Sequence, residues 1–281
     1  MVSMNKLTPA RRTAVVRCLV EGNSIRSTVR LTGVAKNTVT KLLVDLGAAC
    51  SEYQDRVLRD LSCRLIQADE IWSFSNAKAR NVPEEHRGEF GWGDVWTWTA
   101  IDADTKLVPA WLVADRSSAS AIALMDDLRG RLANRVQLTT DGHRAYLEAV
   151  EGAFGSNIDY AQIIKLYGTD PEADTRYSPA KCLGIKVEEI SGHPDHAAIS
   201  TSYVERQNLT MRMGMRRFTR LTNAFSRKVE NLAAAVSLHF MYYNFARPHK
   251  TLANPYPRTP AMAAGVADHV WRIEEIVALV G

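Results

Sequence analysis

The first 60 residues carry apolar positions at helical spacing in three consecutive runs. Residues 7–21 form one such run, with a single apolar face. Ser24 can cap a second helix, because its hydroxyl can accept a free backbone N–H, and Gly33 supplies the turn that ends this helix. A third helix is predicted over about residues 36–46, ending at Gly47. The inward-facing positions of the second and third helices are Ile25, Val34, Val39 and Leu42.

This pattern predicts an all-α domain over residues 1–60. Its third helix exposes short polar and basic side chains, which is typical of the second helix of a helix-turn-helix, the one that enters the major groove of DNA. Asn side chains can pair with adenine, and Lys with guanine or phosphate. The candidate DNA contacts here are Lys36, Asn37, Thr38, Thr40 and Lys41. A plain three-helix packing unit is the alternative for the same pattern.

Residues 61–252 change in character, from extended apolar runs to helices. Strands are predicted in the runs 63–74, 91–102, 107–115, 135–143 and 160–168, and helices over 118–133 and 144–154. From residue 196 to about 245 the spacing is helical. Strands in a hairpin, then alternating helices and strands, then long helices indicate an α/β domain with a mixed central sheet. Residues 169–182 read as a loop or insertion, and residues 253–281 as a C-terminal linker followed by a short amphipathic helix.

Composition and charge narrow the class of protein. The chain has 46% hydrophobic and 23% charged residues, as in ordinary globular domains, and a net charge of only +4. The positive charge is concentrated, because residues 206–228 carry seven Lys or Arg and no acid. A polyanion such as nucleic acid is therefore a plausible partner, with a solvated helix face as the alternative. No apolar run approaches the ~20 residues of a membrane span, and the four cysteines form no CxxC pair. We expect a cytoplasmic protein without a membrane partner.

Three carboxylates stand out from this background. Asp69 interrupts an apolar strand, where an unpaired charge is costly. Its neighbour Glu70 must point to the opposite face of that strand. Asp141 ends a later strand, and Glu205 begins the basic helix. Together, Asp69, Asp141 and Glu205 would make an oxygen-rich pocket suited to Mg²⁺ or Mn²⁺. Taken singly, an Asp before Gly is more often a turn residue, and a lone Glu on a helix is more often solvated.

The motifs around these carboxylates resemble those of a known enzyme family. ADEIWSF at 68–74, TTDGHRAY at 139–146 and YVERQN at 203–208 followed by Arg212 resemble the three motifs of DDE-type insertion-sequence transposases, nearest to the family of insertion sequence one. The segment YNFARPHKTL, which ends at Leu252, resembles the end of many such catalytic domains. The likeness covers about residues 64–252. This sequence departs from the family pattern at one point: some relatives carry an N-terminal zinc-binding motif, and the cysteines of this chain offer none.

The resemblance implies an RNase H-like fold in residues 61–252, with Asp69, Asp141 and Glu205 as a catalytic triad binding two Mg²⁺ ions. It implies cleavage of DNA at transposon ends and joining of the freed 3′-OH to target DNA. A homo-oligomer, at least a dimer on DNA, and association with a bacterial or archaeal nucleoid are expected by analogy. The further candidate DNA contacts, all on or just after the Glu205 helix, are Asn208, Arg212, Arg216 and Arg217.

Two other functions fit the same residues. A sequence-specific DNA-binding regulator derived from a transposase would keep the helix-turn-helix and lose the chemistry, although a binder has no need of three carboxylates. A metal-dependent nuclease of the same fold would cut DNA without joining strands. His143, His193 and His196 lie near the predicted site in sequence, and loop or capping roles are the simpler interpretation for them.

Overall fold

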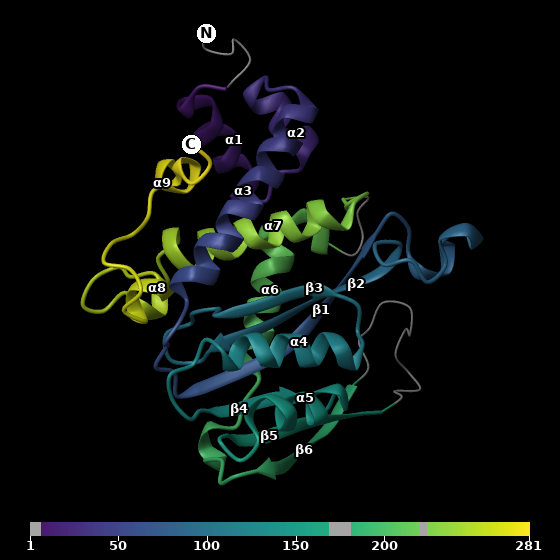
Figure 1. The fold of residues 1–281 in the computed structure, drawn as a ribbon, viewed down its shortest axis with the longest axis vertical. Coiled ribbons are helices and arrows are strands. Elements are labelled where there is room, and N and C mark those ends of the chain that lie inside the picture. The colour runs from purple at the N-terminus through teal and green to yellow at the C-terminus, as the bar shows by residue number, and fades with distance from the viewer. Residues whose placement is uncertain (1–6, 169–180, 220–223) are drawn as a thin grey trace.

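The computed structural model of the chain describes residues 7–168, 181–219 and 224–281 (Figure 1). The predicted loop at 169–182 therefore lies almost entirely outside the described residues. The described part is a mixed α/β structure, in which one six-stranded sheet is flanked by helices. The strands are β1 (Leu65–Ser75), β2 (Gly93–Asp102), β3 (Ala110–Ala114), β4 (Gln137–Asp141), β5 (Asp159–Gly168) and β6 (Lys181–Ser191).

The sheet has the strand order β3-β2-β1-β4-β5-β6. The first three strands form an antiparallel meander, and β4 and β5 run parallel to β1. This mixture of directions is consistent with the RNase H-like fold that the sequence motifs imply. The sixth strand pairs antiparallel with β5 and is an unexpected addition. Its sequence, KCLGIKVEEIS, was not predicted as a strand, and its apolar side chains remain exposed instead of joining the core.

Helices cover both faces of the sheet. The helix α4 (Ser118–Arg129) packs on α5 (Ala145–Phe154) and on β2 and β3, and both lie over one face (Figure 1). The helix α6 (Ser202–Gly214) lies over the other face, against β1 and β2. Neighbouring residues of β1 consequently meet different helices, because successive side chains of a strand point to opposite faces.

The three predicted N-terminal helices are present as α1 (Pro9–Val20), α2 (Ile25–Thr32) and α3 (Lys36–Val57). Their local signals are confirmed in detail. The Ser24 hydroxyl accepts from the Ser27 amide at 3.0 Å, and Gly33 follows α2 with a positive φ of 66°, which glycine adopts at little cost. Their use as a DNA-binding helix-turn-helix stays a prediction.

The predicted end of α3 at Gly47 is wrong. The helix continues ten residues farther, to Val57, and crosses α7 (Val229–Met241) at this glycine. A Cβ atom on Gly47 would lie 2.4 Å from the Ala234 Cα and 2.5 Å from its Cβ. Gly47 is therefore a contact between two helices, and α3 connects the N-terminal helices to the core that packs on the sheet.

The C-terminal segment also packs on the rest of the chain. The stretch expected to be a linker contains α8 (Pro260–Ala263), where Ala261 is fully buried. The short final helix α9 (Ile273–Ala278) returns to α1 in the upper part of Figure 1. The Arg12 guanidinium donates to the Gly281 carbonyl at 2.9 Å.

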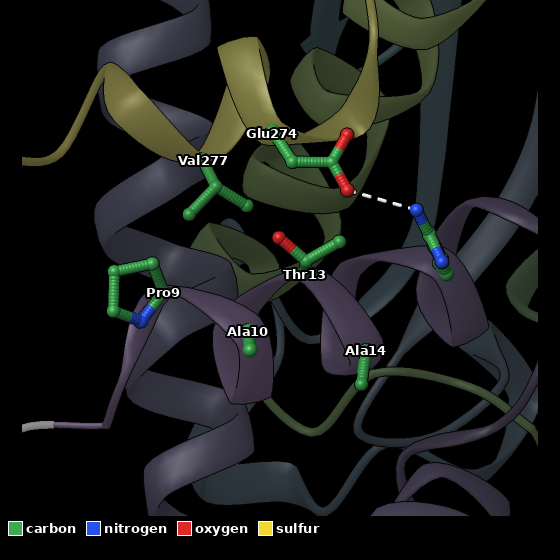
Figure 2. Close-up of a pocket in the computed structure, with 7 residues that line it drawn as sticks. Pro9, Ala10, Thr13, Ala14, Glu274 and Val277 are labelled. Atoms are coloured by element: carbon green, nitrogen blue, oxygen red, sulfur yellow. Dashed lines mark hydrogen bonds and ion pairs between the residues drawn. The ribbon is translucent and has the colours of Figure 1, made fainter.

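A pocket of about 590 Å³ lies between α1 and α9 (Figure 2). An ion pair between the Arg17 guanidinium and the Glu274 carboxylate, at 2.8 Å, spans it. Its lining residues are Pro9, Ala10, Thr13, Ala14, Arg17, Glu274 and Val277. None of them is a candidate functional residue, so this pocket is separate from the carboxylates. Among the described helices, none is long and apolar enough to cross a lipid bilayer.

Candidate active site

Asp69 lies in the middle of β1, opposite Thr99 of β2. Its Oδ1 accepts from the Glu70 backbone amide at 2.8 Å, and its Oδ2 accepts from the Asn208 side-chain amide, also at 2.8 Å. Asn208 lies on α6 and is buried. The strand alternation therefore directs Asp69 to the α6 face of the sheet, and α6 fixes the orientation of its carboxylate.

Asp141 is the last residue of β4, at the carboxyl end of a strand parallel to β1. Its Oδ1 accepts from the His143 backbone amide at 3.0 Å, which shapes the turn into α5. The residue between them must be small, since a Cβ on Gly142 would lie 2.9 Å from the Ile164 Cγ1. The turn thus holds Asp141 beside Asp69. Ligands of open α/β sheets commonly bind at such strand ends.

Glu70 joins these two aspartates. One carboxylate oxygen from each of Asp69, Glu70 and Asp141 lies within 4.8 Å of the others. Glu70 is nevertheless held from the opposite face of the sheet: Arg116 forms an ion pair with its Oε1 at 2.6 Å, and the Tyr146 hydroxyl donates to its Oε2 at 3.1 Å. Sequence reasoning named Glu70 as a neighbour of Asp69 but did not find Arg116 or Tyr146, which no sequence motif connects to it.

The clustering of negative charge changes the acidity of these groups. Burial raises the pKa of Asp69 to about 7, and the charges of Asp141 and Glu70 act in the same direction. Burial and the Asp141 charge also raise the pKa of Glu70, while Arg116 opposes the rise. Burial and the Glu70 charge keep the pKa of the Tyr146 hydroxyl well above its usual value, so Tyr146 is a neutral hydrogen-bond donor. A divalent cation would relieve the repulsion between these carboxylates.

Glu205, the third predicted carboxylate, is placed differently. It lies in the first turn of α6, and its Oε1 accepts from the Thr201 hydroxyl at 2.6 Å and from the Lys165 ammonium at 2.5 Å. Burial raises its pKa, but these two hydrogen bonds and the Lys165 charge outweigh burial and lower the pKa overall. Its own charge still raises the pKa of Asp69. Glu205 is thus a neighbour of the cluster, paired with Lys165 of β5.

The chemistry of this donor set fits a hard divalent cation. Carboxylate oxygens are the ligands that Mg²⁺ and Mn²⁺ prefer, and three of them converge here. Asp69 and Asp141 each accept from a backbone amide and contribute an oxygen to this position, whereas the Glu70 carboxylate is paired with Arg116. Asp69 and Asp141 are therefore the residues best placed to hold an ion, with Glu205 adjacent.

The predicted DNA contacts fall in two separate places. At the start of α3, Lys36, Asn37 and Lys41 are exposed and Thr38 and Thr40 are half-buried. Lys41 is paired with Asp45 at 2.6 Å.

The second group lies along and just after α6. Arg216 is exposed, and Arg212 is half-buried. The Arg217 guanidinium donates to the Ser226 hydroxyl at 2.8 Å, and burial lowers the pKa of Arg217 to about 10. Asn208 is buried and directed at Asp69, so its position is that of a residue that orients a carboxylate.

The histidines near the site have structural partners. His143 stacks on Trp98, with ring centroids 5.8 Å apart, and burial lowers its pKa. The His193 amide donates to Asp159 at 2.8 Å, and the His196 ring pairs with Glu189. Of the three, only His143 lies beside the carboxylates.

Comparisons with known proteins give a limited picture. No protein-family model and no curated protein matches the chain. Similar solved structures include the Mos1 strand transfer complex, with 13% identity over 57% of this chain and 60% of that chain and a TM-score of 0.25. The piggyBac transposase synaptic complex with hairpin DNA has 9% identity over 97% of this chain and 69% of that chain, with a TM-score of 0.39.

A pre-cleavage Mos1 transpososome is also similar, with 12% identity over 57% of this chain and 61% of that chain and a TM-score of 0.21. This chain therefore spans about 60% of the Mos1 chains that it matches. All three TM-scores lie below 0.5.

Proposed function

We propose that the protein is a metal-dependent DNA transposase of the DDE type. It cleaves phosphodiester bonds at the ends of a mobile element and joins the 3′-OH to target DNA. The observation that supports this most is the convergence of Asp69 and Asp141 from two parallel strands, beside the helix that carries Glu205 and the basic residues after it. The resemblance of the three sequence motifs agrees with this geometry.

In this proposal, Asp69, Asp141 and Glu205 hold two Mg²⁺ ions, for which Mn²⁺ can substitute. The bound ions would activate a water or a 3′-hydroxyl and stabilise the leaving oxygen of a phosphodiester. The chain's own residues prepare the site for this. Asn208 and the Glu70 amide orient the Asp69 carboxylate, and Thr201 and Lys165 position Glu205. Glu70, paired with Arg116, supports the sheet behind the site.

DNA is the proposed partner, in the form of transposon ends and target DNA. Helix α3 would present Lys36, Asn37 and Lys41 to a major groove, with Thr38 and Thr40 beside them. Arg212, Arg216 and Arg217 would contact phosphates near the cleavage site, since they lie on or directly after the helix that carries Glu205. Synapsis of two ends requires at least a dimer. We place this activity in the cytoplasm, at the nucleoid of a bacterium or archaeon.

The test is a cleavage and strand-joining assay with the full chain, a DNA fragment bearing the element's flanking sequence, and Mg²⁺ or Mn²⁺. Wild type is compared with Asp69→Asn and Glu205→Gln, which keep shape and remove charge. Asp126→Asn, at an exposed position of α4, is the matched control. We expect metal-dependent cuts and joined products from wild type and the control, and neither from the two site variants. Activity that survives Asp69→Asn would contradict the proposal.

One observation favours a second function. Glu205 is paired with Lys165 and lies outside the group of three converging carboxylates. A regulator that binds DNA through its helices and performs no catalysis would be compatible with this pairing. The same assay separates the possibilities: specific binding without cutting under either metal indicates the regulator, and cutting without joined products indicates a nuclease.

A further inference from the structure

One of the three converging carboxylates already has a cation of the protein beside it. Oxygens of Asp69, Glu70 and Asp141 lie within 4.8 Å of one another. The Arg116 guanidinium pairs with the Glu70 Oε1 through Nη2 at 2.6 Å, and its Nε donates to the same oxygen at 2.7 Å. A positive side chain is therefore bound to the same group of carboxylates that would hold a divalent cation.

The end of β4 explains how Glu70 approaches the two aspartates, although it projects to the opposite face of the sheet from Asp69. The parallel register of β1 on β4 ends at the pair Ala68 and Thr140, and β1 continues past it to residue 75. Asp141 is the last residue of β4. Glu70 lies two residues beyond the last register pair, so its carboxylate can approach that of Asp141 past the end of β4.

The two partners of this ion pair differ in their freedom to move. The Glu70 side chain is 1% exposed, and its Oε2 accepts from the buried Tyr146 hydroxyl at 3.1 Å. The Arg116 side chain is 43% exposed, and its guanidinium lies 4.6 Å from the centroid of the Trp96 ring. A buried carboxylate without a cation is strongly destabilising, whereas an exposed guanidinium leaves its partner for water at little cost. Glu70 therefore requires a cation, and Arg116 is one that another cation can replace.

We propose that Arg116 is the replaceable counter-cation of this carboxylate group and competes with the divalent cation for Glu70. When the ion binds, Glu70 joins Asp69 and Asp141 as a ligand, and Arg116 turns out to solvent. A doubly charged ion attracts three carboxylates more strongly than one guanidinium does, so the exchange favours the ion. This inference rests on the metal site of the proposed function and adds a ligand and a regulator of affinity to it.

Calorimetric titration of the full chain with Mn²⁺, without DNA, tests the competition. We expect Arg116→Gln to bind Mn²⁺ roughly 10-fold more tightly than wild type, because the competing charge is removed. Arg116→Lys keeps the charge and should stay near wild type. The double variant Glu70→Gln/Arg116→Gln should lose the gain, since the contested carboxylate is gone. Arg144→Gln removes a charge at an exposed position at the start of α5 and is the matched control, with the affinity of wild type.

Thermal unfolding with and without Mn²⁺ separates this role from a purely structural ion pair. With a chelator present, Arg116→Gln should melt at a lower temperature than wild type, because Glu70 is left without a cation. Saturating Mn²⁺ should remove most of this difference, since the ion then neutralises Glu70 and binds only the folded state. If Arg116→Gln is unfolded in chelator, recovery of its circular dichroism spectrum on adding Mn²⁺ is the same expected result.

Two results would overturn the inference while leaving the proposed metal site in place. One is wild-type or weaker Mn²⁺ affinity in Arg116→Gln when wild type itself binds Mn²⁺. The other is an equal loss of melting temperature in chelator and in Mn²⁺, which is what a structural ion pair produces. If wild type and Asp69→Asn both bind no Mn²⁺, the metal site of the proposed function is wrong, and the inference is wrong with it.

Discussion

The Asn208 side-chain amide donates to the Asp69 Oδ2 at 2.8 Å, across 139 residues of sequence. Asn208 is three residues after Glu205, so one turn of α6 carries both a candidate metal ligand and the donor that orients another. Its Oδ1 is buried and has no hydrogen-bond partner among the described residues. The Asn208 side-chain amide therefore has Asp69 as its hydrogen-bond partner. Replacing Asn208 tests whether this hydrogen bond organises the site.

We expect Asn208→Ala to reduce metal-dependent cleavage by roughly 10–100-fold, the usual cost of losing a residue that orients a metal ligand. Loss of a hydrogen bond to the charged carboxylate should raise the pKa of Asp69, so in the metal-free protein the pH profile of its titration should move to higher pH. Leu209→Ala, at the exposed neighbouring position, is the control. An unchanged pH profile in Asn208→Ala would show that the amide has no influence on Asp69.

The pKa of Asp69 also predicts how stability depends on pH. In the folded protein this carboxyl has a pKa of about 7, raised from 3.8 by burial and neighbouring charges. Between pH 4 and 7 the folded state keeps a proton that the unfolded state has released, so the free energy of unfolding falls as pH rises through this window. The shift corresponds to at most roughly 4 kcal/mol.

Asp69→Asn removes the ionisable carboxyl and with it the loss of folding free energy at high pH. With a chelator present, we expect the variant to melt at a higher temperature than wild type at pH 8, and the difference to disappear below pH 4. Thermal unfolding followed by circular dichroism across this pH range checks the sign. A variant less stable than wild type at pH 8 would mean that the Asp69 charge is compensated in the folded protein.

The buried carboxylate of Glu70 depends on Arg116. Its side chain is 1% exposed, and Arg116 supplies the ion pair. We expect Arg116→Ala to lower the free energy of unfolding by roughly 3 kcal/mol, because a buried charge is left without its partner. Adding Glu70→Gln should recover most of this loss. In contrast, Arg87→Ala breaks an exposed pair with Glu84 and should cost less than ~1 kcal/mol in the same denaturant titration.

Two glycines in helices should respond oppositely to the same substitution. Gly47→Ala places a methyl group 2.5 Å from the Ala234 Cβ, so α3 and α7 must separate, and we expect a loss of about 1–3 kcal/mol. Gly152 lies in α5 with open space around it, so Gly152→Ala should stabilise by roughly 0.5–1 kcal/mol. Urea titrations measure both. Equal effects at the two positions would contradict the close crossing at Gly47.

The basic residues after α6 should control the salt dependence of DNA binding. Replacing Arg216 by Ala should weaken binding to all sequences and reduce the slope of log K against log salt by about 1. Neutralising Arg212, Arg216 and Arg217 together should reduce this slope further. Arg144→Ala, exposed at the start of α5, is the control. If binding of the triple variant equals that of wild type at every salt concentration, these residues do not contact phosphate.

By itself, the sequence determined the elements whose signals are local. The Ser24 cap, the turn at Gly33, the hairpin of β2 and β3, and the placement of Asp141 at a strand end all follow from hydrophobic period and turn chemistry. That Asp141 lies level with Asp69 did not follow from the sequence, because Asp69 is in the middle of β1 and only the parallel register of β4 on β1 brings the two together.

Only the tertiary structure decided which side chains meet over long separations. The Asn208 amide donates to Asp69, and the Lys165 ammonium donates to Glu205. Helix α3 continues past Gly47, which packs against Ala234 of α7. These contacts depend on strand register and helix rotation, which no local pattern specifies. The strand β6 was not predicted although Leu183, Ile185 and Val187 stand at alternate positions, and only the structure shows that this segment pairs with β5 as the last strand of the described sheet.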